Sequence, residues 1–174
     1  MRWKYEDEAL KKLERDGMRP SRAGGQAQRQ LEAAARECRK WVYPWLRGKP
    51  YKDLPFVSLV YIYHFVQTEQ KCTCFDGICH IFDDNSAAIG VVDEILLGRE
   101  YDYQLLVFIH ELCHLSHMSH NEEFVTYLNG ILAEFNQATG RHLVNDQAVI
   151  EEHKAAAKRF NADWRTDAGT VRII

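Results

Sequence analysis

The sequence has no long hydrophobic run and no leader-like start. Among its 174 residues, no apolar stretch reaches the roughly 18 residues needed to span a bilayer. The first residues, MRWKYEDEALKKLERDG, are charged throughout and lack the apolar core of a secretory signal. Internal repeats and low-complexity tracts are absent as well. We therefore expect a cytoplasmic globular protein with no membrane partner.

Cysteine is sparse and odd in number, with five residues. Without an export signal, reduced thiols are a better interpretation than disulfides. The segment CTCFDGICH brings Cys72, Cys74, Cys79 and His80 together, but its spacing is not that of a familiar zinc ribbon. Small core residues are the favoured interpretation, and a second metal site stays open.

Charge is distributed unevenly along the chain. Residues 1–52 hold 14 Lys and Arg against 7 Asp and Glu, whereas residues 53–174 hold 8 against 18. A basic segment can contact nucleic acid. A solvated helix face, or contact with the acidic remainder of the protein, is the favoured interpretation here. A nucleic-acid partner for the basic N-terminal third stays open.

Hydrophobic spacing in the first half predicts helices and then a small sheet. We expect a short helix over 5–16 and a longer one over about 26–45, which Pro44 should end or kink. The β-branched and aromatic segment FVSLVYIYHFVQT predicts a strand over 56–68. A turn at Asp76-Gly77 favours a hairpin, and AAIGVVDEIL predicts another strand of the same sheet over 87–96.

The second half predicts helices. Asp102 is the expected N-cap of a helix that is apolar on most of its circumference. A second helix should begin near residue 120 and close at Gly140, and a third should cover about 146–160. The expected fold is therefore α+β.

The segment IHELCHLSHMSHNEEF contains the candidate metal ligands and general base. His110 and His114 are four residues apart, so on a helix both imidazoles lie on one face and can reach one metal ion. Glu111 is rotated about 100° from His110, beside the metal, where a general base can take a proton from water. Between Asp102 and Glu122, Glu111 is the only acidic or basic side chain apart from histidine. An isolated carboxylate in an apolar helix is costly unless a cation satisfies it.

A third ligand is needed if zinc is to keep three protein ligands and one open position. On an unbroken helix, His117 lies about 4.5 Å beyond His114 along the axis and reaches the metal poorly. The pattern S-x-x-E, from Ser119 to Glu122, is typical of the start of a new helix. If the chain turns over about 115–118, His120 returns to the metal, and we therefore predict His120 as the third ligand.

The stretch HELCHLSHMSHNEEF resembles the core of small cytosolic zincin metallopeptidases with an H-E-x-x-H-x5-H pattern, the WLM, YgjP-like and SprT-like families. The resemblance covers about 87–135. It implies a zincin-like, minigluzincin-type fold with a small mixed or antiparallel sheet packed on the metal helix. In metzincins a glycine makes the turn after the second histidine, whereas His117 stands there in this chain, which argues against that group.

The resemblance also implies an activity and a set of roles. Zinc would be bound by His110, His114 and His120, and Glu111 would be the base in peptide-bond hydrolysis, most simply by an endopeptidase acting on a peptide or protein. An added donor usually stabilises the tetrahedral oxyanion, and three candidates stay open: His117, Tyr127 and His142. A substrate peptide would pair with an edge strand formed by Ala87, Ala88, Ile89, Gly90, Val91 and Val92.

The predicted organisation has three parts. Residues 1–50 form a basic helical segment, residues 51–162 the zincin-like domain with its C-terminal helix, and residues 163–174 a tail. One alternative function is a catalytically silent binding or regulatory protein that kept the zincin fold. Another is a nucleic-acid-associated peptidase tethered through residues 1–52.

Overall fold

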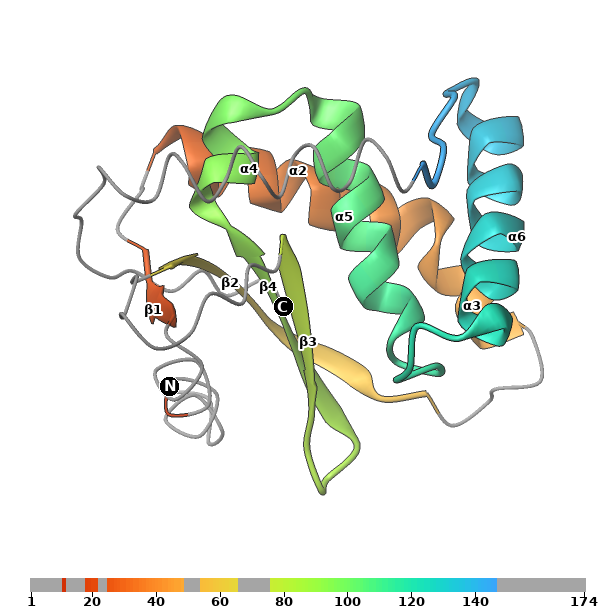
Figure 1. The fold of residues 1–174 in the computed structure, drawn as a ribbon, viewed down its shortest axis with the longest axis horizontal. Helices are drawn as coiled ribbons and strands as arrows, with labels where there is room; N and C mark the ends of the chain where they lie inside the picture. Colours follow the sequence, from red (N-terminus) through yellow and green to blue (C-terminus); the bar gives the residue numbers. More distant parts are fainter. Residues whose placement is uncertain (1–10, 12–17, 22–24, 49–53, 66–75, 147–174) are drawn as a thin grey trace.

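A computed structural model describes residues 11, 18–21, 25–48, 54–65 and 76–146 of the chain. They form a sheet with helices packed against it (Figure 1). No helix in these ranges is both long and apolar enough to cross a bilayer. The elements, in chain order, are β1 (Met18–Pro20), α2 (Gln26–Trp41), α3 (Tyr43–Gly48), β2 (Phe56–Phe65), β3 (Gly77–Ile81), β4 (Ser86–Val92), α4 (Asp93–Gly98), α5 (Tyr101–Cys113) and α6 (Glu122–Thr139).

The sheet is small and mixed, as predicted for an α+β fold. Its strand order is β1-β2-β4-β3, with β2 and β4 parallel and the two outer pairings antiparallel. Strands β2 and β4 are rich in β-branched and aromatic residues, which suit a pleated, buried surface. Helix α5 packs against β3 and β4, so the sheet supports the helix that carries the H-E-x-x-H motif.

The predicted substrate edge strand is wrong. Residues Ala87–Val92 belong to β4, which pairs with β2 on one side and with β3 on the other. The main-chain groups of β4 are therefore used within the sheet, and every residue of the strand is buried. Among the described strands, β3 lies at the edge next to α5.

Two further expectations about the sheet are wrong. The hairpin turn joins β3 to β4 at residues 82–86, where Asn85 adopts a positive φ of 60° and the main-chain nitrogen of Phe82 donates to the oxygen of Ser86 at 2.9 Å. Asp76 instead precedes β3, and its carbonyl accepts from Val92 at 3.0 Å. The strand predicted over 87–96 ends at Val92, because Asp93 and Glu94 begin α4, where acidic residues favour the first turn.

The helices follow the predicted periodicity. Helix α2 buries Leu31 and Cys38 on one face and ends at Trp41, and Pro44 lies in the first turn of α3, where its missing N–H costs nothing. Asp102 is not the N-cap of α5, since the helix begins at Tyr101 and the cap position is Glu100. Gly140 closes α6 in the left-handed conformation, φ 72°, as predicted.

Several predictions lie wholly or partly outside the described residues. These are the helices over 5–16 and about 146–160, the C-terminal end of the strand over 56–68 and the boundary at 162. The predicted division at residue 50 and the nucleic-acid contact stay predictions. Helix α2, which belongs to the basic N-terminal segment, packs against α4, α5 and β2 and contributes its apolar face to the core of the described chain.

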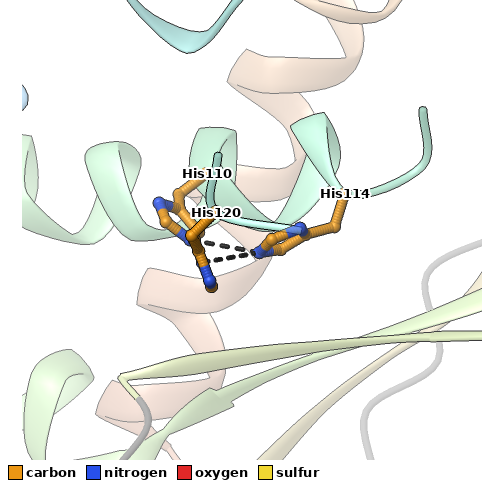
Figure 2. A group of neighbouring side chains, drawn as sticks. All are labelled: His110, His114 and His120. Carbon is orange, nitrogen blue, oxygen red and sulfur yellow. Dashed lines mark hydrogen bonds between the residues drawn. The ribbon is translucent and has the colours of Figure 1, made fainter. Parts of the chain in front are cut away.

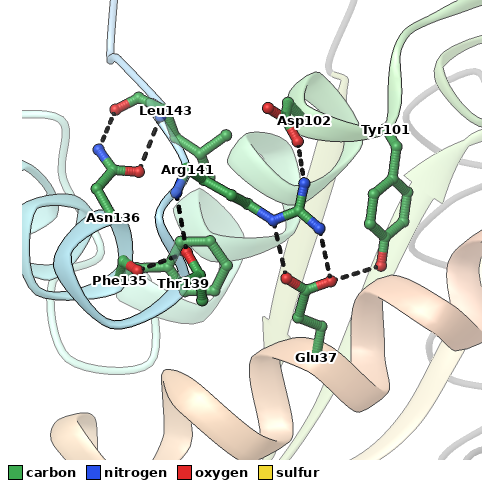
Figure 3. A network of polar contacts seen from close by, with 8 residues as sticks. All are labelled: Glu37, Tyr101, Asp102, Phe135, Asn136, Thr139, Arg141 and Leu143. Atoms are coloured by element: carbon green, nitrogen blue, oxygen red, sulfur yellow. Dashed lines mark hydrogen bonds and ion pairs between the residues drawn. The ribbon is translucent and has the colours of Figure 1, made fainter.

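Arg141, which follows α6, contacts residues of both α2 and α5 (Figure 3). The Arg141 side chain donates to both carboxylate oxygens of Glu37 on α2, at 2.9 and 3.3 Å, and to Asp102 in the first turn of α5. The Tyr101 hydroxyl donates to the same Glu37 carboxylate at 3.1 Å. Charge-assisted, two-pronged contacts of this kind fix geometry as well as adding stability.

The segment after α6 is held a second time through its main chain. The Asn136 side chain donates to the carbonyl of Leu143 and accepts from its nitrogen, both at 2.8 Å. The chain beyond Gly140 is therefore held against α6 as far as Leu143, as Figure 3 shows.

We expect Arg141→Met to lower the free energy of unfolding by about 1 kcal/mol, measured by urea denaturation. The Arg141 side chain is 30% exposed, and solvent screening keeps the cost modest. Arg36→Met is the matched control, because Arg36 is 66% exposed and lies 3.8 Å from Glu32. Equal urea midpoints for the two variants would contradict a bridging role for Arg141.

Candidate metal centre

The metal helix ends in a tight turn, as the sequence predicted. Helix α5 ends at Cys113, and the nitrogens of Ser116 and His117 both donate to the Cys113 carbonyl at 3.1 Å. The next helix, α6, begins at Glu122. The predicted capping box at Ser119 is wrong, because the N-cap is Asn121, whose side-chain oxygen accepts from the nitrogen of Phe124 at 3.0 Å.

Three imidazoles converge across this turn (Figure 2). The Nε2 atoms of His110 and His114 are 3.2 Å apart, one helical turn from each other on α5. His120 comes from the turn before α6, and its Nε2 lies 2.8 Å from that of His110 and 3.1 Å from that of His114. Of the described residues, these three form the one group of His, Cys, Asp and Glu side chains whose atoms could hold a metal ion.

Protons alone cannot satisfy the three Nε2 atoms. A ring nitrogen is a donor when it carries a proton and an acceptor when it does not. With three nitrogens in mutual contact, at least one of the three pairs must therefore join two donors or two acceptors. A cation at the point of convergence removes this conflict, since all three nitrogens can direct lone pairs toward it.

The tautomer of His114 supports the same interpretation. Its Nδ1 lies 2.8 Å from the main-chain carbonyl of His117, which can only accept, so Nδ1 carries the proton. Burial lowers the pKa of His114, which favours the neutral ring. Nε2 of a neutral ring protonated at Nδ1 is a lone-pair donor. The carbonyl is thus an outer partner of the kind that orients a metal-binding imidazole.

The donor set fits a catalytic zinc site. Two nitrogens bound to zinc at about 2.0–2.1 Å with a tetrahedral angle lie about 3.3–3.4 Å apart. The observed separations of 2.8, 3.2 and 3.1 Å require small outward movements of the rings. Three imidazoles leave a fourth position open, which is typical of catalytic rather than structural zinc.

Phe124 is a part of the centre that the sequence did not single out. Its ring stacks on His114 with centroids 4.6 Å apart, and it lies 4.8 Å from His110 and 5.0 Å from His120. The Asn121 cap binds the main-chain nitrogen of the same residue. The start of α6 therefore fixes a single aromatic ring against all three imidazoles. The signal in the sequence was an aromatic residue three positions after a capping asparagine.

Glu111 lies buried beside the imidazoles, on the α5 face toward β3. A Cβ added to Gly77 at the start of β3 would lie 2.6 Å from Glu111 Cγ and 2.8 Å from its Oε1, so only glycine leaves room for this carboxyl. Burial, and after it the negative charge of Asp76, raise the pKa of Glu111 to about 8. A cation at the three imidazoles would lower that pKa. Such a carboxyl is suited to take and return protons near neutral pH.

Asp76 and Tyr103 also line this region. The Tyr103 hydroxyl donates to Asp76 Oδ2 at 2.5 Å, which connects α5 to the residue before β3. Both side chains are buried. Neither was singled out from the sequence, because the contact joins residues far apart in the chain.

The site opens into a cleft of about 500 Å³. Its walls come from β3, α5, the turn, the start of α6 and the segment after α6. His110, Glu111, His114 and His120 all line it, as does Asn145 from the segment after α6. The Arg141 and Asn136 contacts thus hold the segment that brings Asn145 to the cleft.

The three predicted oxyanion donors do not line this cleft. His117 and Tyr127 stack on each other with ring centroids 4.5 Å apart, and His117 Nδ1 lies 2.8 Å from the Ser116 hydroxyl. His142 is exposed on the segment after α6. None of the three is among the residues around the cleft, so the structure does not bring their side chains to it. A role for them stays a prediction.

The predicted second metal site is described only in part. Cys79 is half-buried on β3 and carries a free thiol, and the neighbouring His80 is buried. Cys72 and Cys74 lie outside the described residues. The second site therefore stays a prediction.

We expect Gly77→Ala to destabilise the protein by about 1–3 kcal/mol, because the new methyl group must displace the buried Glu111 carboxyl. Gly130→Ala is the control, since an added Cβ there meets nothing within 4 Å in the interior of α6. That change should stabilise by about 0.5–1 kcal/mol. Thermal unfolding measures the stability of both variants. A Gly77→Ala variant as stable as the parent protein would contradict the described packing of Glu111.

Comparison with known proteins agrees with this geometry. A family model described as YgjP-like, metallopeptidase domain matches residues 101–142. The match covers α5, the turn and α6, with all three histidines and Glu111 inside it. Neither the curated proteins nor the solved structures gave a match. The predicted recognition is thus confirmed over this segment, which is similar to the YgjP-like metallopeptidase domain and contains the three converging histidines.

Proposed function

We propose that the protein is a zinc-dependent endopeptidase in which His110, His114 and His120 hold the metal and Glu111 is the general base. The observation that carries the proposal is the convergence of three Nε2 atoms within 2.8–3.2 Å, beside a buried carboxylate at the wall of an open cleft. The family match to a metallopeptidase domain supports the reaction class.

The metal and the protein contribute different parts of the chemistry. Zinc bound there would polarise the scissile carbonyl and lower the pKa of a water to about 7. Glu111 takes a proton from the attacking water on a carboxylate oxygen and delivers it to the leaving amine nitrogen. The burial that raises its pKa favours this proton transfer. The protonated Nδ1 of His114 donates to the His117 carbonyl, and this hydrogen bond holds the ring in place throughout.

Strand β3 is the candidate platform for the substrate. Its residues Gly77, Ile78 and Cys79 line the cleft, and no other described strand pairs with its outer edge. An extended peptide can add to such an edge through main-chain hydrogen bonds. Pairing along β3 would carry the substrate past Glu111, because Gly77 contacts that carboxyl.

The metal content of the purified, zinc-reconstituted protein is expected to be about one zinc per chain. His120→Ala should weaken zinc affinity by at least about a hundredfold, because it removes one of three converging ligands. His117→Ala should keep the zinc, since the contact with His114 Nδ1 comes from the main-chain carbonyl of residue 117, which the substitution leaves in place. Elemental analysis after dialysis measures both. Zinc retained by His120→Ala, or lost from His117→Ala, would contradict the ligand set.

Glu111→Gln should lower kcat/KM for peptide hydrolysis by about a thousandfold while the zinc stays bound, because the amide cannot accept the proton. Glu123→Gln is the matched control, since Glu123 is exposed in the first turn of α6. Cleavage of a mixed peptide library, followed by mass spectrometry, reports the activity. A fully active Glu111→Gln variant would refute the mechanism. A zinc-loaded parent that cleaves nothing would favour the silent binding protein.

A further inference from the structure

We propose that the cleft beside the imidazoles accepts an apolar substrate side chain next to the scissile bond and rejects an acidic one. The inference rests on the proposed peptidase function and names the class of substrate residue that the site takes. It follows from the walls of the cleft and from the charges within it.

One wall is a stripe on α5 that continues from the metal site. Tyr103, Leu106 and Val107 line the cleft at helical spacing above His110 and Glu111. They retain 9%, 7% and 6% exposure, whereas Leu105 and Ile109 on the other faces of the helix retain 0%. The stripe is thus a surface within reach of a ligand, and its two aliphatic members offer no hydrogen bond.

The facing walls are also apolar. Ile78 comes from β3, Met118 from the turn and Val125 from the first turns of α6. Met118 is 60% exposed and Val125 41% exposed, and they are two of the four large hydrophobic side chains exposed in the described part of the chain. Apolar surface left in contact with water beside a cleft is stabilised when an apolar ligand covers it.

The walls of the cleft offer an acidic side chain no cationic partner apart from the metal centre. No Lys or Arg lines the cleft among the residues that the structure describes. A substrate carboxylate directed toward the apolar walls, away from the imidazoles, would lose its water without gaining an ion pair. A basic side chain is less suited than an apolar one, because Asp76 already accepts a hydrogen bond from the Tyr103 hydroxyl and the aliphatic wall residues Ile78, Leu106, Val107 and Val125 offer no acceptor.

A pair of small probes tests the preference without requiring catalysis. Dipeptide hydroxamates bind a zinc centre through the hydroxamate group and place one side chain in the neighbouring space. We expect the zinc-loaded protein to bind the leucine-type compound at least about tenfold more tightly than the aspartate-type and lysine-type compounds, by calorimetry. Equal affinities, or tighter binding of either charged compound, would overturn the proposal.

Two matched variants test whether the wall of the cleft at Val125 contacts the substrate side chain. Val125→Lys places a cation on the wall of the cleft, and Val144→Lys makes the same change at a residue that is 67% exposed and does not line it. Val125→Lys should raise the affinity for the aspartate-type compound relative to the leucine-type by about five- to tenfold, and Val144→Lys should leave the ratio unchanged. An unchanged ratio in Val125→Lys would refute the placement of the substrate side chain.

Cleavage of the peptide library tests the apolar preference separately from the proposed peptidase activity on which it rests. Cleavage sites should be enriched in Leu, Ile, Met or Phe at one position beside the scissile bond and depleted in Asp and Glu. Cleavage without that preference would overturn the inference and leave the peptidase function standing. A protein that binds zinc and the leucine-type hydroxamate tightly but cleaves nothing would remove the peptidase function and keep the apolar selectivity of the cleft.

Discussion

The arrangement of this protein depends on three imidazole nitrogens held within 2.8–3.2 Å of one another. Such a cluster cannot be satisfied by protons, because each nitrogen is either a donor or an acceptor and three mutual contacts cannot all be complementary. Three local contacts hold the imidazole cluster in place. The His117 carbonyl sets the tautomer of His114, the Asn121 cap fixes the start of α6, and Phe124 packs against every ring.

The rest of the fold positions the base and the cleft around that cluster. Strand β3 contributes a glycine where any larger side chain would collide with Glu111, so the edge of the sheet and the metal helix fit together at one residue. Arg141 connects α2, α5 and the segment after α6. That segment brings Asn145 to the cleft, which makes the distant N-terminal helix part of the support for the site.

Local patterns predicted the centre better than they predicted its surroundings. The spacing of His110 and His114 depends only on helix geometry, and the return of His120 required only a turn after α5, for which polar capping residues gave a signal. The capping residue itself was misidentified, since Ser119 and Asn121 both suit the position. Asn121 is the one placed to accept from Phe124, the third residue after it.

The order of strands could not be predicted, because it is set by long-range pairing rather than by composition. The family resemblance implies an edge strand at Ala87–Val92, yet a strand buried throughout is typical of a sheet interior. The Gly77–Glu111 and Asp76–Tyr103 contacts join residues more than 25 positions apart and had no local signature. Helix α4 is not predicted for a different reason: it has only six residues, and its apolar part, Ile95–Leu97, is too short to show a helical period.

The most direct test of the central claim is X-ray absorption spectroscopy at the zinc edge of the zinc-loaded protein. The account predicts three imidazole nitrogens and one further light atom, all at about 2.0–2.1 Å. A sulfur at about 2.3 Å, or fewer than three imidazoles, would show that zinc binds elsewhere in the chain and would contradict the assignment of His110, His114 and His120.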